Sequence, residues 1–116
     1  MFFVGIDIAK NSHEATVIDC NGKFIVKPFK FQNSIQGFQK LLSSLSPISE
    51  NVSDFEFGME ATGHYWLNLY TKLIEAGYNV HVINPVQSDA LRGLYIRHTK
   101  NDAKDAFSSA ELIRFG

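Results

Sequence analysis

The sequence opens with an apolar run that carries a single carboxylate, Phe2-Phe3-Val4-Gly5-Ile6-Asp7-Ile8-Ala9-Lys10. A run this apolar is typical of a β-strand buried on both faces of a sheet. Placing an ionised aspartate there is costly unless another group pairs with it or it coordinates a cation. We therefore expect the fold to hold Asp7 beside other acids around metal ions.

The composition predicts one domain and gives no overall sign of a partner. The chain has 116 residues, of which 45% are hydrophobic, so its length suits a single core. Its formal net charge of −1 comes from 11 Lys and Arg against 12 Asp and Glu, which does not by itself indicate a nucleic-acid-binding protein. Cys20 is alone, and no stretch resembles a secretory signal or a membrane span. We expect a cytoplasmic protein with no membrane partner.

The first third of the chain predicts an antiparallel meander. Residues 2–8 form the expected first strand, and residues 13–19 alternate loosely with β-branched side chains, as a half-exposed second strand would. Asn21-Gly22 is typical of a tight hairpin turn. Residues 23–31 follow as a third strand, in which Pro28 indicates an edge position or a bulge.

From residue 33 the apolar period changes to that of a helix. Asn33 and Gln36 resemble a capping box, and the apolar face expected after them is Ile35, Phe38, Leu41, Leu42 and Leu45. A fourth strand is expected over residues 55–60, a helix from Gly63 to Gly77, and a fifth strand over residues 78–83. A short helix should begin at Pro85, and a last helix near Asn101.

Three antiparallel strands followed by alternating helices and strands is the element order of a ribonuclease-H-like α/β domain. Residues 33–53 and 61–77 are long enough to make right-handed crossovers between parallel strands. The expected fold is therefore a five-stranded mixed sheet of order 3-2-1-4-5, flanked by helices. Because the sequence ends without a clear helix cap at residues 113–116, we expect residues 1–116 to be one domain of a longer protein.

Four acids are placed where they could converge. Asp7 and Glu60 end strands that should be neighbours, while Asp102 and Asp105 are three residues apart on one face of a helix. Two-metal phosphoryl transfer needs several carboxylates around hard divalent cations. Asp102, Asp105 and Glu60 also have a structural explanation, because carboxylates near helix N-termini are stabilised by the helix dipole. Asp7 is harder to explain structurally, because a capping or turn role does not need so apolar a stretch before it. The joint placement of the four acids is what favours a metal site.

The same residues lie in motifs that resemble a known family. Gly5-Ile6-Asp7-Ile8-Ala9-Lys10, Glu60-Ala61-Thr62-Gly63-His64-Tyr65-Trp66, Asn84-Pro85 and Lys100-Asn101-Asp102-Ala103-Lys104-Asp105-Ala106 together resemble the N-terminal domain of the DEDD transposases of the insertion sequence 110 family. The resemblance covers essentially the whole chain in the right order. It departs mildly at Asn101, where the family usually has threonine.

The resemblance implies a chemistry and a set of partners. Asp7, Glu60, Asp102 and Asp105 would be the DEDD acids, which act in catalysis and bind metal in a RuvC-like fold, with Mg²⁺ as cofactor and Mn²⁺ as a substitute. It also implies DNA cleavage and strand exchange, a non-coding bridge RNA, a homo-oligomer of the full-length protein, and a C-terminal domain with a catalytic serine. Neither that domain nor that serine can be placed in this sequence.

Positive charge near the proposed acids indicates a nucleic-acid surface. The candidate residues are Lys10, Arg92, Arg97, His98, Lys100 and Lys104, which could follow a phosphate backbone or form an ordinary solvated face. Three other functions share this fold: a Holliday-junction-resolvase-like nuclease, an actin-like or sugar-kinase-like ATP-binding half-domain, and a non-catalytic nucleic-acid-binding module. The ATP-binding alternative is weakened because residues 8–10, Ile-Ala-Lys, stand where that class needs glycine and a small hydroxyl.

Overall fold

A computed structural model describes residues 1–61, 63–83 and 104–115 of the chain, without the side chains of residues 104, 105, 108 and 115. Within these ranges five strands form one sheet of order β3-β2-β1-β4-β5. The strands are β1 (Phe2–Asp7), β2 (Ser12–Asp19), β3 (Phe24–Gln32), β4 (Phe55–Glu60) and β5 (Asn79–Ile83). β1, β2 and β3 pair antiparallel, whereas β4 is parallel to β1 and β5 is parallel to β4. The predicted mixed sheet and its strand order are confirmed.

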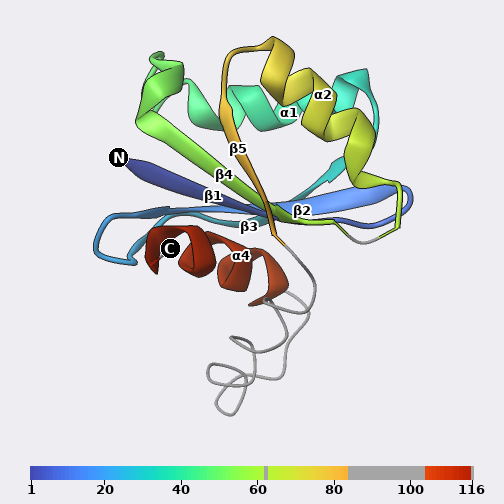
Figure 1. The fold of residues 1–116 in the computed structure, drawn as a ribbon. Helices are drawn as coiled ribbons and strands as arrows, with labels where there is room; N and C mark the ends of the chain where they lie inside the picture. Colours follow the sequence, from blue (N-terminus) through green and yellow to red (C-terminus); the bar gives the residue numbers. More distant parts are fainter. Residues whose placement is uncertain (62, 84–103, 116) are drawn as a thin grey trace.

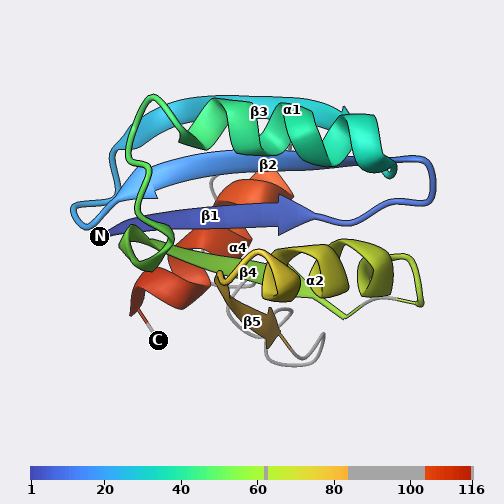
Figure 2. The ribbon, with the colours of Figure 1, turned by 90° about the horizontal axis from the view of Figure 1, so that it is seen from above.

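Helices cover both faces of the sheet (Figures 1 and 2). The crossovers are α1 (Ile35–Leu45) and α2 (Trp66–Glu75), which lie on one face, and a short 3₁₀ helix, η1 (Val52–Asp54), precedes β4. The last helix, α4 (Lys104–Phe115), lies on the opposite face (Figure 1). The expected helix from Pro85 and the first residues of the last helix, 101–103, fall outside the described residues.

The main core lies between the sheet and the α1–α2 layer. Alternate residues of the central strands point into it, among them Val4 and Ile6 of β1 and Phe57 and Met59 of β4, all fully buried. Leu41 and Leu45 of α1 and Leu69 and Leu73 of α2 close the core from the other side. Burying a side chain of this size stabilises the fold by about 1.5–3 kcal/mol relative to leaving it exposed.

The opposite face of the sheet is built for close approach by α4. Gly5 and Gly58 are register partners on β1 and β4, and both lie under this helix. A Cβ atom at Gly5 would lie 1.9 Å from the Ala106 carbonyl oxygen, and one at Gly58 would lie 2.7 Å from the Ile113 Cγ2 atom. The two glycines therefore let the helix backbone rest directly on the sheet.

The start of α1 differs from the prediction. Its N-cap is Ser34, whose Oγ accepts a hydrogen bond from the Gly37 N–H at 3.1 Å, not Asn33. Asn33 is held elsewhere, because its backbone N–H donates to the Asn11 carbonyl at 2.9 Å. The helix consequently begins one residue later, and Ile35, expected on the apolar face, is 63% exposed.

The two predicted turn glycines adopt the left-handed backbone that their positions require. Gly22, in the β2–β3 hairpin, has a φ of 81°, and Gly77, after α2, has a φ of 94°. The ladder between β2 and β3 is irregular near Val17, opposite the stretch that contains Pro28, and β3 is an edge strand. The expectation drawn from Pro28 is confirmed. Within the described ranges, no helix has the length and apolar character needed to cross a membrane.

Candidate carboxylate site

Asp7 and Glu60 end neighbouring parallel strands. Ile6 of β1 pairs with Met59 of β4, so the next residue along each strand, Asp7 and Glu60, comes to the same edge of the sheet. Strands in a sheet are about 4.8 Å apart. Both side chains are half-buried. The structure thus brings together the two acids that were expected at adjacent strand ends.

Both acids are on the sheet face that α4 covers. Residues two apart in a strand share a face, so Asp7 lies on the side of Gly5, and Glu60 lies on the side of Gly58. Since both glycines contact α4, the two carboxylates belong to its layer and not to the apolar core. Asp7 is therefore half-buried at the end of its strand, outside the apolar core.

The first turn of α4 lies toward the same end of the sheet. Ala106 and Ala110 of α4 lie against Gly5, two residues before Asp7. At the other end of the helix, Arg114 reaches the β2–β3 hairpin, where its Nη1 donates to the Cys20 carbonyl at 3.5 Å. The helix therefore begins near the Asp7 end of the sheet and runs away from it. Because Asp105 directly precedes Ala106, its backbone also lies near that end.

The other predicted site residues lie beyond what the structure describes. Lys104 and Asp105 have their backbone in α4 and no described side chain. The remaining ones in the undescribed segment are Arg92, Arg97, His98, Lys100 and Asp102. Lys10 is described: it is exposed in the loop after β1, and its carbonyl accepts a 3.5 Å hydrogen bond from the Asn33 side chain.

Glu14 is a third acid at this edge, and sequence reasoning missed it. It is the register partner of Asp7 across the β1–β2 pair, so the two side chains share the α4 face. With Glu60 on the other side of Asp7, the row Glu14–Asp7–Glu60 crosses three adjacent strands. The sequence predicted that the first two strands pair as a hairpin. Residues 8–12, which connect them, do not determine which residue of the second strand lies opposite Asp7, so Glu14 could not be identified.

His13 fixes the loop that follows Asp7. Its ring is buried, with 1% of the residue exposed, and packs edge-on against Phe31 with centroids 5.4 Å apart. The His13 Nδ1 atom accepts a 3.1 Å hydrogen bond from the Ala9 N–H, which requires the unprotonated nitrogen. Burial lowers the pKa of His13, and the nearby Asn33 side chain only partly opposes this shift. The neutral ring therefore anchors Ala9, two residues beyond Asp7.

Carboxylate oxygens are the ligands that hard divalent cations prefer, so Asp7 and Glu60 suit such an ion chemically. Among the residues that the structure describes, however, no three His, Cys, Asp or Glu side chains are grouped closely enough to hold a metal ion. A complete site at this edge would need ligands from the segment before Ala106, where Asp102 and Asp105 lie.

Comparison with known proteins gives the family. The family model of the DEDD transposases of insertion sequence 110, described as a transposase, matches residues 4–116. The chain belongs to this transposase family. A pilin gene-inverting protein of Moraxella bovis is 36% identical over 115 residues, and so is its counterpart from Moraxella lacunata. In both cases the match covers 98% of this chain and 34% of the relative, so this member of the family spans about a third of their length.

Solved structures agree with this family member in fold. The RuvC protein of T. thermophilus, solved in complex with a Holliday junction substrate, gives a TM-score of 0.62 at 16% identity, covering 95% of this chain and 90% of that one. The Fowlpox virus resolvase, solved with Holliday junction DNA, gives 0.51 at 10% identity, covering 99% and 95%. The transposase chain therefore has the RuvC-like, ribonuclease-H-like fold that its element order predicted.

Proposed function

We propose that residues 1–116 are the RuvC-like DEDD catalytic domain of a longer transposase that cuts and exchanges DNA strands. The observation that carries this proposal is the placement of Asp7 and Glu60 side by side, on the face covered by α4, in a chain of the insertion sequence 110 transposase family. Phosphodiester chemistry needs such convergent carboxylates, whereas a purely structural strand end does not.

In the proposed mechanism each acid has a defined task. Asp7 and Glu60 hold divalent cations from the sheet, and Asp102 and Asp105 complete the site from the segment that leads into α4. Mg²⁺ is the proposed cofactor, with Mn²⁺ as a substitute; when bound, such ions stabilise the charge on the attacking and leaving oxygens of the phosphodiester. The close contacts of α4 with Gly5 and Gly58 support this proposal, because they hold the helix backbone on the sheet face that carries Asp7 and Glu60.

Partners follow from the same proposal. Lys10, Arg92, Arg97, His98, Lys100 and Lys104 would contact the phosphate backbone of DNA near the acids. The family resemblance supports a bridge RNA as guide, a homo-oligomer of the full-length protein working in the cytoplasm, and a catalytic serine in a further domain. The length of the Moraxella relatives leaves room for such a domain.

Strand cleavage tests the proposal. With labelled duplex DNA and Mn²⁺, Asp7→Asn and Glu60→Gln are expected to lower the rate of nicking at least 100-fold, because each removes a charged ligand from the site. Glu75→Gln is the matched control, since Glu75 is an exposed acid on α2. Nicking that is unaffected by either site variant would contradict the proposed role. A Holliday junction cleaved in preference to duplex would indicate a resolvase instead.

A further inference from the structure

One continuous part of this nearly neutral chain carries several lysines and no acid. Residues 20–49 contain four lysines and no aspartate or glutamate, although the whole chain has a net charge of −1. The lysines are Lys23, Lys27, Lys30 and Lys40, and all four are exposed. The segment forms the β2–β3 hairpin, the edge strand β3 and helix α1, so the charges gather along one side of the domain.

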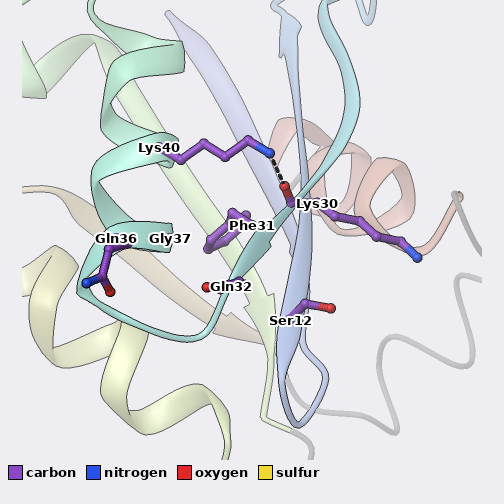
Figure 3. Close-up of a pocket in the computed structure, with 7 residues that line it drawn as sticks. All are labelled: Ser12, Lys30, Phe31, Gln32, Gln36, Gly37 and Lys40. Atoms are coloured by element: carbon purple, nitrogen blue, oxygen red, sulfur yellow. Dashed lines mark hydrogen bonds between the residues drawn. The ribbon is translucent and has the colours of Figure 1, made fainter.

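A cleft of about 390 Å³ lies in this cationic side, between the end of β3 and the first turns of α1 (Figure 3). Its polar lining includes Lys30, Lys40, Ser12, Gln32 and Gln36. The floor is tight, because a Cβ atom at Gly37 would lie 1.7 Å from the Gln32 carbonyl oxygen. The lining thus contains ammonium, amide and hydroxyl groups and no carboxylate, and the Lys30 side chain extends from it toward the opposite face of the sheet (Figure 3).

Lys40 is held at the mouth of the cleft. Its side chain crosses from α1 to the edge of the sheet (Figure 3), where Nζ donates to the Lys30 carbonyl at 2.7 Å. The Nζ atom also lies 6.0 Å from the centroid of the Phe29 ring. An ammonium has three N–H donors, so two remain for a ligand. Ordering the side chain in advance lowers the entropic cost of binding an anion.

The cleft continues toward Asp7. Ser12 and Lys30 also line a second depression of about 150 Å³, which contains Asp7 and Glu14. Glu14 pairs with Asp7 on one side and with Lys30 on the other, so the Lys30 Cα lies two strand spacings, about 10 Å, from that of Asp7. In Figure 3 the Lys30 side chain points away from α1, toward the face of the sheet that carries α4. Lys30 therefore connects the two depressions around the sheet edge.

We propose that this lysine cleft binds the phosphate backbone of the DNA strand whose reacting phosphodiester lies at Asp7. The inference rests on the proposed function, because it takes Asp7 as the position of the reacting phosphodiester. Lys30 and Ser12 line both depressions, so the two form one path. Lys40 and Lys30 neutralise backbone phosphates a few nucleotides from the reacting one. The amides of Gln32 and Gln36 donate to phosphate or sugar oxygens.

The test is DNA binding measured without metal. Fluorescence anisotropy of a labelled duplex in EDTA, over a salt series, is compared for Lys30→Gln, Lys40→Gln and the control Lys72→Gln, which removes a charge from α2. Each cleft variant is expected to weaken binding about threefold to tenfold and to lower the slope of log K against log salt by about 0.9, the value for one lost phosphate contact on a duplex. Lys72→Gln should change neither quantity.

Further variants and probes keep the outcomes distinct. Lys40→Arg retains the charge and should restore binding, and thermal unfolding checks that Lys40→Gln stays folded at the assay temperature. Equal behaviour of Lys30→Gln, Lys40→Gln and Lys72→Gln would overturn the proposal. A lysine dependence seen with RNA of the same sequence and not with DNA would overturn it as well. Because the assay contains no metal, its result does not depend on a metal ion at the carboxylates, so this proposal and the proposed function can fail separately.

Discussion

At the scale of single residues, Asp7 is the centre of a row of three carboxylates. Glu14 and Glu60 occupy the neighbouring strands on either side of it, on the same face of the sheet. Like charges at directly opposite strand positions repel one another, which destabilises the sheet locally. A cation held by Asp7 and Glu60 together with acids from the segment before Ala106, as proposed, would reduce that repulsion.

His13 gives the fold a pH dependence of known sign. Burial lowers the pKa of His13, so the folded chain favours the neutral ring more strongly than the unfolded chain does. This stabilisation is complete above the ordinary histidine pKa of about 6.5 and is lost as pH falls through that value toward the lower folded pKa. We expect the midpoint of thermal unfolding to drop between pH 7.5 and pH 5.5.

The variant His13→Asn identifies the source of that drop. Asparagine keeps an acceptor near the Ala9 N–H but does not titrate, so the variant should have a nearly flat midpoint over the same pH range. His64→Asn is the control, because His64 is exposed and should leave the drop unchanged. A midpoint of His13→Asn that falls as steeply as that of the original chain would assign the pH dependence to other groups.

At the scale of elements, the contact between α4 and the sheet controls where Asp105 lies. This contact depends on the absence of a side chain at Gly5, where the obstructing atoms belong to the helix backbone. At Gly58 the nearest atom is instead the Cγ2 methyl of Ile113, at 2.7 Å, and the nearest atom of the helix backbone, the Ser109 carbonyl oxygen, is 3.1 Å away. The two glycines therefore differ in how much the helix must move if a methyl group is added.

Gly5→Ala is expected to destabilise the chain by about 1–3 kcal/mol, because α4 must shift away from the sheet. Gly58→Ala should cost less, because the backbone of α4 is farther from the added methyl group there. Urea unfolding of both variants measures the difference, and Gly5→Ala should also weaken metal binding by moving the first turn of α4 relative to Asp7. A Gly58→Ala variant that loses more stability than Gly5→Ala would contradict this account of the contact.

Most elements could be predicted from local pattern, and the misses have tertiary causes. The β4 bounds and the turn glycines followed from alternation and from residues that allow positive φ. Ser34 replaced Asn33 as the N-cap because Asn33 is tied to the loop after β1, a contact between distant segments that no local pattern contains. Glu14 was missed for a related reason, because hairpin register depends on how both strands meet the core.

Among the described residues, three carboxylates at the strand ends and the lysines of residues 20–49 occupy adjoining parts of the whole molecule. The carboxylates of Glu14, Asp7 and Glu60 lie where β2, β1 and β4 meet α4, while the lysines of residues 20–49 line the β3 and α1 side. The sequence shows that residues 20–49 contain no acid, but it does not show that this segment lies near Asp7. That nearness depends on β2 lying between β1 and β3, which brings Lys30 two strands from Asp7.

If Asp7 and its neighbouring acids hold a divalent metal ion, as we propose, the ion should stabilise the folded chain, and a metal titration measures that effect. The midpoint of thermal unfolding is followed as Mg²⁺ or Mn²⁺ is added to the original chain and to Asp7→Asn. Binding to the folded state alone stabilises it by about 2.7 kcal/mol at a hundred times the dissociation constant. We predict a rising midpoint for the original chain and little change for Asp7→Asn. Identical rises in both proteins would contradict a metal site at Asp7.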